Sequence, residues 1–122
     1  MKTITAGDTI KINVEADDKE TGIKFVEVEA SNIKDTPGSS SFEVKGSTNW
    51  LESANNAIVE LTIPEYIPST KWKVTGIVLI NGAGRTIKYS AGKDFEPILF
   101  TVKHKEGVDL SPAKLISVSL VE

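Results

Sequence analysis

Residues 9–16 read TIKINVEA, and this run decides the fold class. Its even-numbered residues are apolar and its odd-numbered residues are polar, which is the period-2 pattern of a half-buried β-strand. A charged turn, DDKETG at residues 17–22, ends the strand. The chain has 13 Ile, 11 Val and 11 Thr against 7 Leu and 8 Ala, and β-branched side chains favour extended backbone. The sequence therefore predicts an all-β protein.

Similar patterns recur outward from this run, with turn residues between the apolar segments. Strands are expected over residues 9–16, 23–30, 42–46, 57–64, 71–80, 86–89, 98–102 and 114–121. The alternation breaks near Phe25, which predicts a bulge or a change of buried face there. Gly76 predicts a bulge or a close backbone approach within its strand, and the run NGAG at residues 81–84 predicts a hairpin turn.

Short strands at this regular spacing favour a sandwich of two antiparallel sheets. A closed barrel is the alternative, but oligonucleotide-binding barrels more often carry a basic, aromatic-lined face than these strands do. The 122 residues are enough for one hydrophobic core. Apolar positions within the strands predict that Trp72, Val74, Leu79 and Phe100 belong to this core.

Three motifs between Ala6 and Val102 add to this interpretation: AGDTIKI at residues 6–12, IPSTKWKV at 67–74 and IVLINGAGRT at 77–86. With them, the chain resembles the bacterial Ig-like repeat domains of Gram-positive surface proteins and secreted multidomain enzymes. The resemblance implies an Ig-like, or fibronectin III-like, antiparallel sandwich of about 7–8 strands. It also implies a place at the cell surface or outside the cell, within a longer chain.

The same resemblance predicts one boundary, which divides the chain into two parts. Residues 1–105 are expected to form the Ig-like domain, and residues 106–122 a linker with a terminal strand. The run PAKLISVSL at residues 112–120 looks like the strand that opens such a domain. Residues 114–121 are thus either the last strand of this domain or the first strand of a following module.

The residue inventory argues against several classes of function. Cysteine is absent, His104 is the single histidine, and the net charge is −3. These facts argue against thiolate chemistry, a histidine-rich zinc site and a nucleic-acid partner, and no apolar run reaches the about 20 residues of a membrane span. His104 is expected at a solvated strand end, and Glu27, Glu29 and Glu60 at solvated outward positions. We therefore expect no catalytic residues and no enzyme activity.

Asp17, Asp18 and Glu20 place three carboxylates in one turn, which makes them a weak candidate calcium site. Asp35 or Asp94 would have to complete the ligand set, and a merely solvated turn is the alternative. The family resemblance suggests a second cation loop, but Asn81 and Arg85 stand where the family often has Asp and Asn. Otherwise no cofactor is expected.

Trp50, Tyr66 and Tyr89 are candidates for stacking against sugar rings. The alternatives are that Trp50 covers the core as a lid and that Tyr66 packs over an edge of the sandwich. Two functions follow. The first is a non-catalytic spacer or adhesive module of a larger extracellular bacterial protein, which contacts neighbouring domains of its own chain and a surface protein or glycan. The second is a carbohydrate-binding accessory module of a secreted glycan-active enzyme or cell-surface protein.

Overall fold

Eight strands make up the regular structure of the described residues, which are 2–34, 41–107 and 114–121 of the computed structural model. The strands are β1 (Lys2–Thr5), β2 (Thr9–Glu15), β3 (Ile23–Asn32), β4 (Glu43–Asn49), β5 (Asn56–Thr62), β6 (Thr70–Asn81), β7 (Thr86–Ser90) and β8 (Ile98–Lys103). No helix occurs in these ranges. The prediction of an all-β protein is confirmed.

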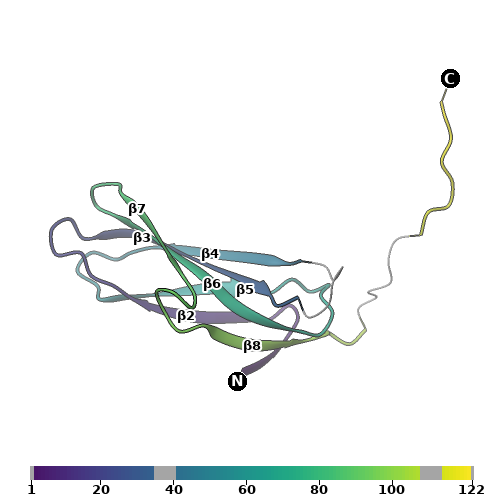
Figure 1. The fold of residues 1–122 in the computed structure, drawn as a ribbon, viewed down its shortest axis with the longest axis horizontal. Helices are drawn as coiled ribbons and strands as arrows, with labels where there is room; N and C mark the ends of the chain where they lie inside the picture. Colours follow the sequence, from purple (N-terminus) through teal and green to yellow (C-terminus); the bar gives the residue numbers. More distant parts are fainter. Residues whose placement is uncertain (1, 35–40, 108–113, 122) are drawn as a thin grey trace.

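The strands form one large sheet and one small sheet (Figure 1). The large sheet has the order β1-β8-β6-β3-β4, and β7 also pairs with β6. β8 pairs with the first half of β6 and β7 with its second half, so these two short strands share one side of the longest strand. The small sheet is the antiparallel pair β2–β5.

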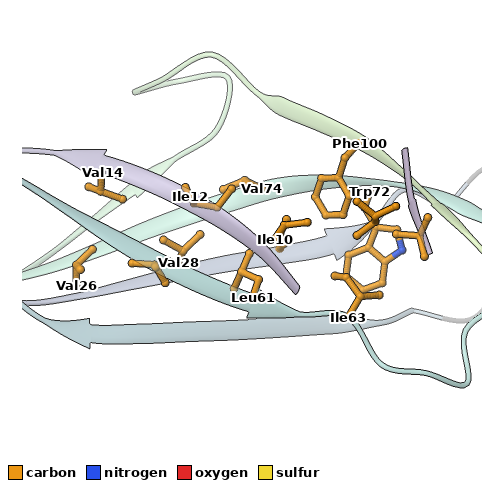
Figure 2. Packing of buried hydrophobic residues seen from close by; sticks show 14 of the residues in the cluster. Ile10, Ile12, Val14, Val26, Val28, Leu61, Ile63, Trp72, Val74 and Phe100 are labelled. Carbon is orange, nitrogen blue, oxygen red and sulfur yellow. The ribbon is translucent and has the colours of Figure 1, made fainter. Parts of the chain in front are cut away.

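The hydrophobic core lies between the two sheets (Figure 2). The even-numbered residues Ile10, Ile12 and Val14 point inward from β2, and each is 5–8 % exposed. Trp72 is completely buried, and its ring stacks on Phe100 at a centroid distance of 6.1 Å. The other fully or almost fully buried residues come from β1, β3, β5, β6, β8 and three connections: Ile4, Ala6, Val26, Val28, Ala30, Trp50, Val59, Leu61, Ile63, Ile67, Val74 and Val102.

The expected irregularities are present. The pairing of β3 with β6 shifts between Ile23 and Phe25, as the broken alternation predicted. It shifts again where Glu29 lies opposite Gly76 and Ala30 lies opposite Val74, which leaves Thr75 as an extra residue on β6. The NGAG run forms the predicted hairpin, since the Asn81 N–H donates to the Arg85 carbonyl at 3.1 Å. The positions where the apolar–polar alternation of the sequence breaks therefore correspond to bulges or register shifts in the sheet.

Two predicted elements differ from the structure. The expected strand at 42–46 runs from Glu43 to Asn49, so Gly46 lies inside β4 and does not end it. Residues 114–121 form no strand, and their side chains are exposed. Their alternating sequence supplies an apolar row, but no strand of the described chain pairs with it. The segment forms no strand of this domain in the structure, and its role in this domain or in a following module stays a prediction.

Two further features correct the expected architecture. β1 is a short strand at residues that were not predicted to form one, and it pairs with β8 in parallel, so the large sheet is not purely antiparallel. Trp72, Val74 and Phe100 are core residues as predicted, but Leu79 is only half-buried. Leu79 lies opposite Ile87 of β7, in a part of the large sheet that extends past the small one.

The sheets come closest where β4 passes β5, and a glycine permits this approach. A Cβ atom added at Gly46 would collide with the Glu60 carbonyl oxygen and lie 2.9 Å from the Leu61 Cδ2. This carbonyl points away from β2, and its strand, β5, is held in place by pairing with β2. Gly46 thus lets β4 cover one edge of the small sheet.

Replacing Gly46 by valine should therefore destabilise the protein by about 1–3 kcal/mol or more, the usual cost of overpacking a site that cannot relax. The free energy of unfolding from urea titration measures this. Ser47→Val, which adds the same side chain at the exposed neighbouring residue, is the control and should cost much less. Equal losses for the two variants would contradict the close approach of β4 to β5.

Candidate functional site

A groove of about 500 Å³ runs along β2, between the small sheet and the part of the large sheet formed by β6, β7 and β8. Its apolar floor consists of Ile12, Val14, Ala16, Ile77, Leu79, Tyr89, Phe95 and Ile98. Within this floor, Ile77 and Leu79 of β6 are half-buried and pack against the core, and Tyr89 of β7 is 36 % exposed. Four acidic residues, Glu15, Asp17, Asp94 and Glu96, lie on the rim of this β2 groove.

β2 also presents a free hydrogen-bonding edge to the groove. It pairs with β5 and, in the described ranges, with no other strand. The Ala16 N–H donates to the Asn55 carbonyl at 3.4 Å, and antiparallel bonding alternates, so the even-numbered residues of β2 bond to β5. The N–H and C=O groups of Lys11 and Asn13 consequently point away from β5. An extended chain could pair with them.

The loop at the groove is held by Asp94. Its Oδ2 accepts a hydrogen bond from the Ser90 N–H at 2.8 Å, and the Gly92 N–H donates to the Phe95 carbonyl, also at 2.8 Å. These bonds fold residues 90–95 into a tight turn between β7 and β8. The turn places Phe95 on the groove floor.

One of the three predicted calcium ligands, Asp18, accepts hydrogen bonds from the chain itself. Asp18 Oδ1 accepts hydrogen bonds from the Glu20 and Thr21 N–H groups, and its Oδ2 accepts one from Asn81 Nδ2 at 3.0 Å. The Thr21 bond and then the Asn81 bond are the main causes that lower the pKa of Asp18. This carboxylate ties the β2–β3 turn to the β6–β7 hairpin.

No group of three acidic or histidine side chains converges as a metal site within the described ranges. Asp17 and Glu20 lie in the same turn as Asp18, but Asp94 belongs to the turn at the groove. Asp35 lies outside the described residues. The geometry of the turn is therefore explained by hydrogen bonds from the chain itself.

The three candidate aromatic residues lie apart. Trp50 follows β4 and is 7 % exposed, and its Nε1 donates to the Ala54 carbonyl at 2.9 Å, so it covers the core as a lid. Tyr66 lies in the β5–β6 connection at the opposite end of the sheets and is 70 % exposed, so it does not pack over an edge. Only Tyr89 lines the groove.

His104 follows the end of β8, as expected for a residue after the strand. Its backbone N–H donates to the Ser69 Oγ at 2.8 Å, and the residue is half-buried. The neighbouring Lys105 Nζ lies 2.7 Å from the Glu65 carboxylate. These contacts fix the chain where it leaves the large sheet.

A charged cluster on the outer face of the large sheet was not predicted. Glu29 is only 8 % exposed, which corrects the expectation that it is solvated. Its carboxylate lies 2.9 Å from the Lys88 Nζ of β7 and 3.6 Å from the Lys45 Nζ of β4. The Lys88 bond reaches across β6 above Gly76, where an added Cβ would lie 3.1 Å from the Glu29 Oε2. Gly76 was the sequence feature that could have indicated this ion pair, because a side chain at this position would crowd Glu29 and Lys88.

Comparison with known protein families and with curated proteins finds no match to the chain. The described residues also contain no helix with the length and apolar character needed to cross a membrane.

Glu29→Gln should lower the free energy of unfolding at neutral pH by about 1–3 kcal/mol, the usual worth of hydrogen bonds to a charged group. The Lys88 bond is the main cause that lowers the pKa of Glu29. The stabilisation is therefore full above the pKa of glutamate in the unfolded chain, about 4.3, and disappears as pH falls through the lower folded pKa. Urea titrations across this acid range test it.

Glu43→Gln is the matched control, because Glu43 is exposed and lies 3.7 Å from the same Lys45 Nζ. It should change stability little at any pH. A Glu29→Gln protein whose pH profile parallels that of the unmodified protein would show that the buried ion pair does not form.

Proposed function

We propose that the chain is a non-catalytic Ig-like sandwich domain that serves as a spacer or adhesive module in a larger extracellular bacterial protein. The observation that carries this proposal is the parallel pairing of β1 with β8. The chain enters β1 and leaves β8 in the same direction, and β1 lies beside the last four residues of β8. An entry and an exit with the same direction suit modules that are joined one after another.

The strand order supports the Ig-like part of the proposal. A two-stranded sheet faces a larger sheet in which β3, β6 and β8 are neighbours, and the core lies between them. A buried Trp72 packs on Phe100 in this core, as a tryptophan often does between the sheets of such sandwiches. The AGDT and NGAG motifs lie at the turns before β2 and after β6, which supports the proposed resemblance.

The contacts of the carboxylates support a structural role. Asp18 and Asp94 bind backbone N–H groups of their own turns, and Glu29 binds two lysines. Each of these acidic groups is used to connect strands. The proposal thus accounts for the contacts of these carboxylates without a reaction.

The second candidate function is carbohydrate binding, and one observation favours it. Tyr89 is 36 % exposed and lies in the groove beside Asn13, Asp94 and Glu96, a mixture of aromatic and polar groups that suits a sugar. A glycan array with and without calcium, read for the unmodified protein and Tyr89→Ala, tests this alternative. Binding that Tyr89→Ala abolishes would favour it over the spacer function.

The spacer function predicts the shape of linked domains. Small-angle X-ray scattering of one, two and three copies joined in sequence should give a maximum dimension that rises by a constant increment per copy. The physical reason is that the parallel first and last strands direct each copy onward from the previous one. Copies that fold back into a compact particle, with little growth in maximum dimension, would contradict the proposal.

A further inference from the structure

Residues 114–121 carry an exposed apolar row. Ile116 is 92 % exposed, Val118 82 % and Leu120 86 %, and these three residues alternate with Ser117 and Ser119. This alternation is the pattern of a strand with one buried face, yet the segment pairs with no strand of the described chain. An apolar row of this kind has a strong tendency to find a partner surface.

The β2 groove has the complementary features. β2 is seven residues long, and the row with its flanking residues, 115–121, has the same length. The free edge offers outward N–H and C=O groups at Lys11 and Asn13, while the floor beside it is apolar. One strand that pairs with the edge would therefore also place every second side chain in the groove.

We propose that residues 114–121 of one copy add to β2 of a second copy as an antiparallel strand, with Ile116, Val118 and Leu120 in the β2 groove. This inference rests on the proposed function, since it describes how such modules associate. When the apolar row of the segment lies on the same side as the inward-facing residues of β2, Val118 lies opposite Ile12 and Ile116 lies opposite Val14. Ser117 then lies opposite Asn13, where the backbone bonds form.

Charge favours the antiparallel direction. In this register Lys114 lies next to the end of β2, beside the acidic rim residues Glu15 and Asp17. The opposite direction would move the lysine to the Thr9 end of β2, away from these two carboxylates. Because the donating segment and the accepting groove are different surfaces, the contact is head-to-tail and links successive copies into an open chain or a closed ring.

Sedimentation of the full 122-residue chain from micromolar to millimolar concentration tests the proposal. The protein should self-associate, and Val118→Asp should weaken the association about tenfold or more, because it places a charge on the apolar floor. Ser117→Asp is the matched control, with the same charge one residue away on the outward face. It should have a much smaller effect.

A second pair of variants tests the accepting edge. Lys11→Pro removes an outward N–H without removing a bond to β5, and Lys11→Ala keeps that N–H. Lys11→Pro should abolish self-association and Lys11→Ala should not. A mixture of Val118→Asp, which keeps its groove, with Lys11→Pro, which keeps its segment, should form a dimer and nothing larger. If Lys11→Pro fails to fold, the Val118 and Ser117 variants decide the question.

Three results would overturn the proposal. They are a monomer at every concentration, an association that Val118→Asp leaves intact, and a monomer that Val118→Asp makes less thermostable, which would place the segment on the groove of its own chain. The proposed function is tested separately by scattering from joined copies. A constant increment in maximum dimension together with a monomeric single chain would keep the spacer function and reject this mode of association.

Discussion

The small sheet is not stable in isolation, and the rest of the structure depends on how this sheet is buried against the large one. A two-stranded antiparallel pair is at best marginally stable in water. β2 and β5 are held because Ile10, Ile12, Val59 and Leu61 bury their side chains against the large sheet. Less exposed and exposed side chains alternate along both strands, so a one-residue slip would turn the buried apolar face toward water. The register of the small sheet therefore follows from the core.

This arrangement leaves the small sheet with two unlike edges. β4 approaches the β5 edge closely at Gly46, while the β2 edge borders the groove and pairs with nothing in the described chain. The large sheet is held across the same region by the Glu29 ion pairs, which join β3 to β4 on one side and reach β7 on the other. The molecule is thus closed along one side and open along β2.

The sequence was informative wherever burial follows a simple period. β2, β5 and β8 alternate, and they were predicted within one or two residues. β4 was predicted too short because its side chains alternate only between exposed and half-buried positions, and because Gly46 is typical of a strand end. β1 has four residues and one buried side chain, which is too little pattern to identify.

The candidate site could be predicted only in part, since it depends on which strands lie side by side. Tyr89 was identified as an aromatic residue of interest, but its place in the groove follows from the extension of β7 past β2. Glu29 looked like an ordinary outward residue, because Lys88 is distant in sequence and reaches it across Gly76. Trp50 could be read as a ligand or a lid until the Ala54 hydrogen bond and its burial were known.

β2 is buried on its face but open along its edge. Hydrogen–deuterium exchange of backbone amides, followed by NMR at low protein concentration, distinguishes the bonded amides of β2 from the open ones. We predict slow exchange for Ile10, Ile12 and Val14, which bond to β5, and fast exchange for Lys11 and Asn13. Slow exchange at all five amides would contradict the account, because it would mean that another strand already covers the β2 edge.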